Sequence, residues 1–192
     1  MQNLFSEKKA AQAAAYFLFR ANGRLAVLKL MKLLYLAERL SYERYGEPII
    51  GDALVSMDHG PVLSQTLNRI NGMTQSDEEG WDKWVSNREQ HDVALRDSGL
   101  IRTPEQDLLE LSNADLGILN EIWNSFGHLD KYAIRDYTHD HCPEWQDPCG
   151  SSNPITLQCL FQALEYNNEQ SCELINRLEE SKSLNSVFSP LI

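Results

Sequence analysis

Apolar residues recur at helical spacing along much of the chain, and this pattern predicts a mainly helical protein. A first helix is expected over about 7–21, with Ser6 as its N-cap. A second helix is expected over about 25–45, because Gly46 follows it as a helix stop. The apolar run over 11–19 is too short to span a membrane and is typical of a helix packed in a core.

The middle of the chain has a less regular pattern, which predicts short strands as well as a helix. Residues 49–58 lack helical spacing and favour a strand. Pro61 fits the first turn of a third helix over about 61–70, where the missing N–H of proline costs nothing. Two short apolar runs at 81–85 and 91–95 predict a hairpin across a polar turn.

The last third of the chain returns to helical spacing. Ser112 and Asp115 form a variant of the capping box that opens a helix over about 113–126. A short helix is expected over about 130–138 and a long final helix over about 155–180. Together these elements predict one mainly α domain of about five to six helices with a small antiparallel β element.

The charge of the chain is strongly negative and unevenly distributed. The 192 residues fit a single domain over 1–192 and carry a net charge of −11. Residues 1–45 hold eight basic and three acidic side chains, a charge of +5, so the remainder carries −16. Because phosphates repel an acidic surface, direct nucleic-acid binding is not expected. The acidic remainder forms either solvated helix faces or a surface for a basic partner.

Targeting signals and cysteine spacing indicate the compartment. The polar run 6–9 interrupts the apolar N-terminus, so no signal peptide is expected, and nowhere do about 18 apolar residues run together. The four cysteines are spaced more widely than metal-binding C-x2-C pairs: Cys142, Cys149, Cys159 and Cys172. We therefore expect a cytoplasmic protein with reduced thiols, no cofactor and no membrane partner.

One acidic residue interrupts the apolar stripe of the second predicted helix. The stripe consists of Val27, Leu30, Met31, Leu34 and Ala37. Glu38 falls within it, and a carboxylate cannot be buried without a partner. Glu38 therefore either reaches solvent at the edge of the stripe or makes a buried contact with another segment, such as His59 or Arg135. We expect Glu38 and His59 to lie within side-chain reach of each other.

The tetrapeptide His59-Gly60-Pro61-Val62 predicts a tight turn from a strand into a helix. Gly60 permits backbone angles denied to other residues, and Pro61 fixes φ. The turn would hold His59 in a defined orientation. His59 is then either a structural histidine with satisfied hydrogen bonds or a contact residue in a groove with Glu38 and Tyr35, with a metal ligand or general base as a further alternative.

A second conspicuous block, THDHCPEW, occupies residues 138–145. The block contains possible zinc ligands, and a further cysteine follows it. A zinc site would use His139, His141, Cys142 and Cys149. No second ligand pair lies at a convincing distance, so whether these residues bind metal stays open. We expect Trp145 to anchor the loop by burying its ring, and His139 to cap or hydrogen-bond a neighbouring helix end.

Two blocks carry a resemblance to a known family. The first is residues 32–62, KLLYLAERLSYERYGEPIIGDALVSMDHGPV, and the second is residues 138–145. Together they resemble the Panacea domain of SocA-like antitoxins, from about Val27 to Trp145. The resemblance implies a helical antitoxin that binds a cognate protein toxin. The residues that it implies as toxin contacts or structural anchors are Tyr35, Glu38, Tyr42, His59, Gly60, Pro61, Val62, His139, Pro143 and Trp145.

Other functions remain open alternatives at this point. Within the same family, the protein would be an adaptor that delivers its partner to a protease. A different class is a small metal-dependent hydrolase built on Glu38, His59 and His139. The chain has no glycine-rich phosphate loop, no G-x-S-x-G and no H-E-x-x-H, so we expect no enzymatic activity. The toxin, the stoichiometry, homo-oligomerisation and the choice between steric and proteolytic neutralisation stay open.

Overall fold

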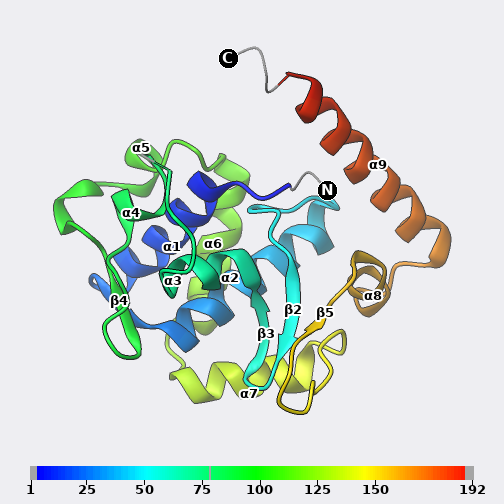
Figure 1. Cartoon of the computed structure of the whole chain (residues 1–192), viewed down its shortest axis with the longest axis horizontal. Helices are drawn as coiled ribbons and strands as arrows, with labels where there is room; N and C mark the ends of the chain where they lie inside the picture. Colours follow the sequence, from blue (N-terminus) through cyan, green and yellow to red (C-terminus); the bar gives the residue numbers. More distant parts are fainter. Residues whose placement is uncertain (1–3, 78, 189–192) are drawn as a thin grey trace.

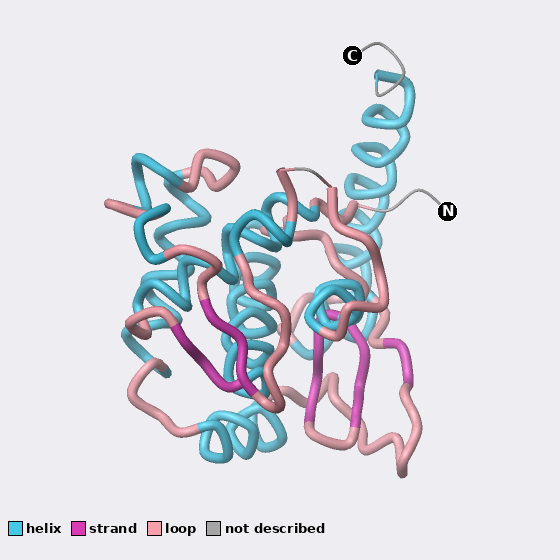
Figure 2. Tube along the Cα trace, turned by 60° about the vertical axis from the view of Figure 1, so that its left-hand side comes forward, coloured by secondary structure: helices cyan, strands magenta, loops and turns pink. Residues whose placement is uncertain are grey.

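The protein is mainly α-helical, with two small antiparallel sheets (Figures 1 and 2). The computed structural model describes residues 4–77 and 79–188. Within these residues there are nine α-helices and one 3-10 helix, so the predicted fold class is confirmed. The helices outnumber the predicted five to six because two of them are single turns and the predicted final helix is two helices.

Helices α1 (Glu7–Arg20) and α2 (Val27–Tyr45) form the centre of the fold. Five alanines of α1 are completely buried: Ala10, Ala11, Ala13, Ala14 and Ala15. Their small side chains allow α2 and other helices to approach α1 closely. As predicted, the side chain of Ser6 caps α1, and Gly46 ends α2 in the left-handed conformation with φ 68°.

Helices α6 (Asn113–Phe126) and α7 (Lys131–His141) pack against α2. The capping box predicted at Ser112 and Asp115 is present in both directions. Asp130 caps α7 by accepting hydrogen bonds from two backbone N–H groups, and α7 continues past its predicted end at residue 138. These two helices close one side of the core around α2.

A three-stranded sheet has the strand order β3-β2-β5, with β2 at Leu54–Met57, β3 at Gly60–Leu63 and β5 at Asn153–Pro154. The predicted helix start at Pro61 is wrong, because Pro61 lies in β3 and helix α3 (Ser64–Ile70) begins three residues later. Since β3 is an edge strand, a residue without an N–H is tolerated there. The His-Gly-Pro-Val segment is therefore part of a hairpin and not a strand-to-helix turn.

The second sheet pairs β1 (Arg24–Ala26) with β4 (Asp92–Ala94). The predicted hairpin between 81–85 and 91–95 is largely wrong, because the first run forms the short helix α4 (Trp81–Trp84). Both tryptophans of α4 are buried, so the apolar run reflects core packing, and a single isolated bridge joins the two runs. The chain then passes through a 3-10 helix at Ser98–Leu100 and helix α5 (Pro104–Asp107).

The C-terminal part contains two helices in place of the single helix predicted over 155–180. Helix α8 (Leu157–Ala163) and helix α9 (Asn168–Phe188) are separated by a turn in which Glu165 has φ 65°. The left-handed residue ends the helical path, which sequence periodicity alone did not indicate. Helix α9 leaves the body of the molecule at an angle (Figure 1). In the described part of the chain no helix is both long and apolar enough to cross a membrane.

A buried carboxylate fixes the start of α1 and was not singled out in the sequence. Glu7 forms an ion pair with Arg69 at 2.7 Å, and its other oxygen accepts from the hydroxyl of Ser76 and the N–H of Trp81. Burial by itself raises the pKa of Glu7, but Arg69 and the N–H and hydroxyl donors outweigh it and lower the pKa to about 2. Glu7 thus connects α1 to α3 and α4.

We expect Glu7→Gln to lower the free energy of unfolding by about 3 kcal/mol at pH 7. Between its ordinary pKa of 4.5 and its folded pKa of about 2, the folded state binds fewer protons than the unfolded state. The contribution is therefore complete above about pH 4.5 and is lost as the pH falls through about 2. Urea denaturation at pH 7 and at pH 3 should show a difference that shrinks at the lower pH.

The matched control for this prediction is Glu43→Gln, which changes an exposed carboxylate of α2. It should leave stability within about 0.5 kcal/mol of the parent at both pH values. A loss for Glu7→Gln that is equally large at pH 7 and pH 3 would contradict the assignment of the stabilisation to ionised Glu7.

Candidate functional site

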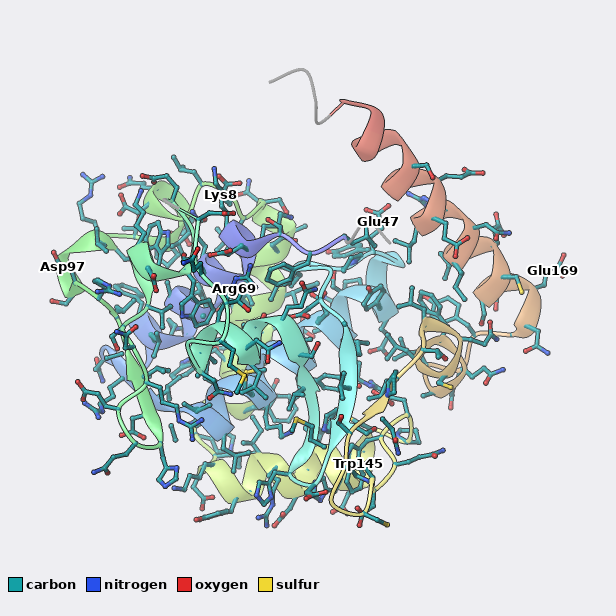
Figure 3. All side chains as sticks on the ribbon, viewed as in Figure 1. Lys8, Glu47, Arg69, Asp97, Trp145 and Glu169 are labelled. Carbon is teal, nitrogen blue, oxygen red and sulfur yellow. The ribbon has the colours of Figure 1, made fainter. Side chains whose placement is uncertain are left out.

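The residues of the two sequence blocks lie around one junction of the fold. There α2, the β2–β3 hairpin, α7 and the loop over 142–148 meet, and their side chains form three groups of contacts. Trp145 marks this region, on the side of the molecule away from Lys8 (Figure 3). The groups are centred on Glu38, on Glu144 and on Lys32.

Glu38 is completely buried and binds the backbone of the loop that follows α2. One oxygen accepts from the N–H groups of Ile49 (3.0 Å) and Ile50 (2.9 Å), and the other accepts from that of Gly51 (2.6 Å). Burial raises the pKa of Glu38 to about 7 against the opposite effect of these three donors. The alternative of a buried contact with another segment is therefore correct, but the expected partner is wrong: His59 is exposed and the donors are amides.

Tyr42 lies one turn beyond Glu38 on α2 and is also buried. Its ring packs edge-on against Phe161 of α8, with the ring centres 5.7 Å apart. Burial, with Glu38 nearby, raises the pKa of Tyr42. Tyr42 thus joins the C-terminal helices to the family block and has the position of a structural anchor.

The second group is a buried ion-pair network around Glu144. Its Oε1 accepts from the hydroxyl of Tyr35 at 2.7 Å and from Nε of Arg39 at 2.8 Å. The side chain of Glu144 has no exposed surface, and its Oε2 has no hydrogen-bond partner among the described residues. Burial, followed by the charge of Glu144, raises the pKa of Tyr35 well above its usual value. Pro143, directly before Glu144, is exposed.

Sequence reasoning missed Glu144. It occupies the variable position of the Pro-x-Trp element, and nothing local distinguishes it from a solvated acid. The sequence offered one indirect indication. Arg39 follows Glu38 on α2, and its positive charge required an acidic partner, which is Glu144.

The third group surrounds Lys32, which is completely buried although it is a lysine. Its Nζ donates to the carbonyl of Pro61 at 2.6 Å, and burial lowers its pKa to about 7. Gly60 has φ 93°, and a Cβ at this position would lie 2.8 Å from Nζ of Lys32 and 2.9 Å from Oγ1 of Thr138. Only glycine fits here, on both conformational and steric grounds. Val62, which follows Pro61 in β3, is also buried.

His139 and Trp145 form a stacked pair that holds the 142–148 loop against the hairpin. The ring centres lie 4.1 Å apart at an angle of 4°, and Nε1 of Trp145 donates to the carbonyl of Met57 at 2.9 Å. Trp145 therefore anchors the loop through this stack and hydrogen bond, although its side chain is only partly buried. The expectation that His139 caps or hydrogen-bonds a helix end is wrong, because its Nε2 has no hydrogen-bond partner among the described residues. Burial lowers the pKa of His139.

The four residues of the zinc alternative are engaged in other ways or separated. His141 stacks on Tyr137, Cys142 is buried, and Cys149 is exposed. Among the described residues no group of three or more His, Cys, Asp or Glu side chains is placed to hold a metal ion. The hydrolase alternative loses its proposed acid as well, because both oxygens of Glu38 accept backbone N–H groups.

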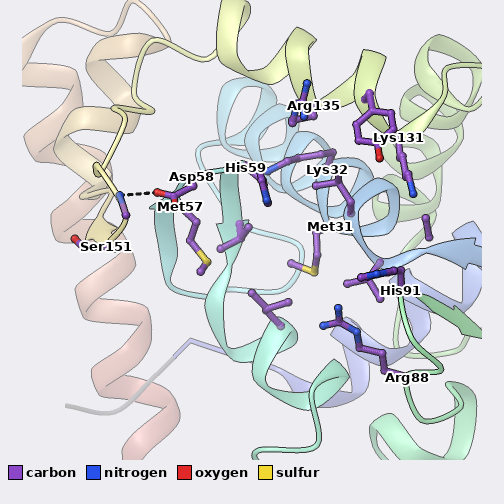
Figure 4. A pocket seen from close by; sticks show the side chains of 17 residues that line it. Met31, Lys32, Met57, Asp58, His59, Arg88, His91, Lys131, Arg135 and Ser151 are labelled. Carbon is purple, nitrogen blue, oxygen red and sulfur yellow. Dashed lines mark hydrogen bonds between the residues drawn. The ribbon is translucent and has the colours of Figure 1, made fainter.

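Among the ten residues singled out from the two blocks, His59 is exposed and also lines a pocket of about 580 Å³ (Figure 4). The pocket lies between the start of α2, the β2–β3 turn, the start of α7 and the loop near residues 88–91. Tyr35 and Glu38 do not line it. The alternative in which His59 shares a groove with Tyr35 and Glu38 is therefore wrong.

The uneven charge of the sequence has a structural counterpart. Basic side chains of 1–45 form ion pairs with acids from later in the chain: Lys9 with Asp115, Arg24 with Glu89 and Asp92, Arg39 with Glu144, and Arg44 with Glu121. Helix α9 instead carries exposed acids that form no ion pair with a described residue: Glu169, Glu173, Glu179 and Glu180. Half of the eight basic side chains of 1–45 are thus paired with later acids, and α9 presents negative charge.

Comparison with known proteins identifies one family. The family model described as antitoxin SocA-like, Panacea domain, matches residues 30–146, which is more than half of the chain. All the residues singled out in the two sequence blocks lie within this range. Searches of curated proteins and of solved structures found no match.

Proposed function

The chain belongs to the SocA-like Panacea antitoxin family, and from this premise we propose that it neutralises a cognate protein toxin by binding it directly. The family match over residues 30–146 is the observation that carries the proposal. An antitoxin-like family also indicates a role in binding a protein and not in catalysis. The proposed place of action is the cytoplasm, and the proposed binding mode is occlusion of the toxin's active surface.

The charge distribution supports a basic toxin as the partner. A toxin that acts on RNA must present basic surface to phosphates, and an acidic protein competes for that surface. The four exposed acids of α9 are available for this role because no described basic residue neutralises them. Helix α9 also projects from the body, so it can enter a concave partner surface (Figure 3).

Co-expression tests the proposed function. The open reading frame beside this gene should arrest growth when it is expressed alone, and growth should recover when this chain is expressed with it. The two purified proteins should form a complex of defined stoichiometry on size exclusion. Recovery of growth with loss of the toxin from the cell, dependent on a protease, would instead identify an adaptor. A harmless neighbour that does not bind this chain would overturn the proposal for that pair.

We expect the association rate with the toxin to depend strongly on salt. Raising the salt concentration from about 50 to 500 mM shortens the Debye length from roughly 14 to 4 Å. Association should slow by about tenfold or more, whereas dissociation should change little, because rim charges mainly steer the encounter. Surface plasmon resonance over this salt range measures both rates.

Charge reversal locates the steering surface. Replacing Glu169, Glu173 and Glu180 with lysine should slow association as high salt does. The matched control replaces Asp77, Glu105 and Glu110, which are exposed acids outside α9, and it should have a smaller effect. An association rate that does not depend on salt would remove the acidic surface as the basis of binding, while the family membership would stand.

A further inference from the structure

The pocket lined by His59 carries positive charge in a protein that is strongly negative. Its walls include Lys32 from α2, Lys131 and Arg135 from α7, and Arg88 from the loop on the opposite side (Figure 4). Asp58 is the one acidic residue among the described residues that line it, and its Oδ1 accepts the N–H of Gly150. The pocket therefore differs in sign from the chain as a whole, with its charge of −11.

The cations of this pocket are mostly uncompensated. Six lysines and arginines with described side chains form no ion pair with a described residue: Lys8, Arg20, Lys29, Lys32, Arg88 and Lys131. Half of these six line this one pocket. Lys32 donates to a carbonyl, and Arg88 donates to the carbonyl of Gln90 and the side chain of Asn71. Lys32 is completely buried and burial lowers its pKa to about 7, so Arg88 and Lys131 are the cations that remain available to an anion.

The start of α2 adds to the positive potential. Ala26, Val27 and Leu28 from this helix end line the pocket. The helix has 19 residues, no acidic residue in its first turn and no side-chain cap, in contrast to α1, α6 and α7. A helix N-terminus that lacks a capping side chain favours a negative group nearby.

The floor of the pocket is apolar. Met31, Met57, Val62 and Leu67 all line the pocket, and Figure 4 shows Met31 between Lys32 and Arg88. An inorganic anion has no apolar surface to bury against these side chains. The organic part of a larger ligand does, and this burial would add to its binding free energy. The volume of about 580 Å³ lies within the range of pockets that hold small organic ligands, roughly 300–1,000 Å³.

We propose that this pocket binds a small organic phosphate of mononucleotide size, with the phosphate held by Arg88 and Lys131 and the organic part of the ligand on the apolar side chains. The site is separate from α9, so ligand binding does not depend on the proposed toxin interaction. An acidic segment of a protein partner is the competing occupant, and the volume of about 580 Å³ with its apolar lining favours the small ligand. The test uses the full chain without toxin, so its result is independent of whether the proposed function is correct.

Titration calorimetry with ADP, adenosine and inorganic phosphate tests the proposal. ADP should bind at least about tenfold more tightly than either of the other two, because it combines the charged group with the organic body. Methyl resonances of the methionines should report the place of binding. The signals of Met31 and Met57 should shift on addition of ADP, and that of exposed Met73 should not.

Variants at the rim provide the second measurement. Arg88→Ala and Lys131→Ala should each weaken ADP binding about tenfold or more, since each removes a charge-assisted hydrogen bond. Lys8→Ala is the matched control, because Lys8 is an exposed cation with no ion pair to a described residue and does not line the pocket. Circular dichroism melts of the variants confirm that each is folded.

Three outcomes would overturn the proposal. The first is unchanged Met31 and Met57 signals at millimolar ADP. The second is inorganic phosphate or adenosine binding as tightly as ADP. The third is a loss for Lys8→Ala as large as those for Arg88→Ala and Lys131→Ala.

Discussion

Replacing Glu38 with alanine is expected to lower the free energy of unfolding by about 4 kcal/mol. The substitution removes the acceptor of three backbone N–H groups, those of Ile49, Ile50 and Gly51, in a segment where water cannot replace it. It also leaves a cavity against Tyr42 and its neighbours in the core. Urea denaturation monitored by circular dichroism measures the change.

Two further variants separate the acceptor from the side-chain volume. Glu38→Gln keeps the shape but places an amide N–H against donors, so we expect a loss of about 2 kcal/mol. Glu43→Ala changes an exposed carboxylate of the same helix and should stay within about 0.5 kcal/mol of the parent. If Glu38→Ala also remained within about 1 kcal/mol of the parent, the role of Glu38 as the acceptor of this loop would be wrong.

Glu144→Ala is expected to have a similarly large effect, about 4 kcal/mol. The hydroxyl of Tyr35 would remain fully buried without an acceptor, and the guanidinium of Arg39 would lose its carboxylate. Because Trp145 is the next residue, the tryptophan fluorescence of the folded protein should change as its stacking on His139 loosens. Thermal melting with fluorescence detection measures both consequences.

A double-mutant cycle provides the control for this network. Tyr35→Phe alone should cost about 1–2 kcal/mol. Combined with Glu144→Ala it should cost less than the sum of the two, since the first substitution removes the donor that the second leaves unsatisfied. Strict additivity would contradict a direct interaction between Tyr35 and Glu144.

Secondary-structure elements were predicted from the sequence more reliably than contacts between side chains. Helix ends with a strong local signal, such as Ser6, the capping box at Ser112 and Gly46, were found where they were expected. Pro61 misled because a proline at the first turn of a helix and one in an edge strand look alike locally. The choice between them depends on pairing with β2, which is a tertiary contact.

The partners of the buried carboxylates likewise depend on tertiary contacts that the sequence does not predict. The interruption of an apolar stripe indicated that Glu38 was unusual. Its hydrogen-bond partners are backbone amides, which are present at almost every residue and so cannot be identified from residue type. Glu7 and Glu144 gave no local signal, because their basic partners Arg69 and Arg39 lie far away in the sequence. The pocket was missed for a related reason, since Lys32, Arg88 and Lys131 come from three separate segments.

The ion pairs between the N-terminal segment and later acids have a consequence for the order of events during synthesis. Lys9, Arg24, Arg39 and Arg44 leave the ribosome well before the acids at positions 89–144 that pair with them. Until the segment that carries Glu144 has emerged, the hydroxyl of Tyr35 and the guanidinium of Arg39 lack their acceptor. Such long-range contacts slow folding. A nascent or prematurely terminated chain that ends before residue 144 therefore lacks the buried network around Glu144.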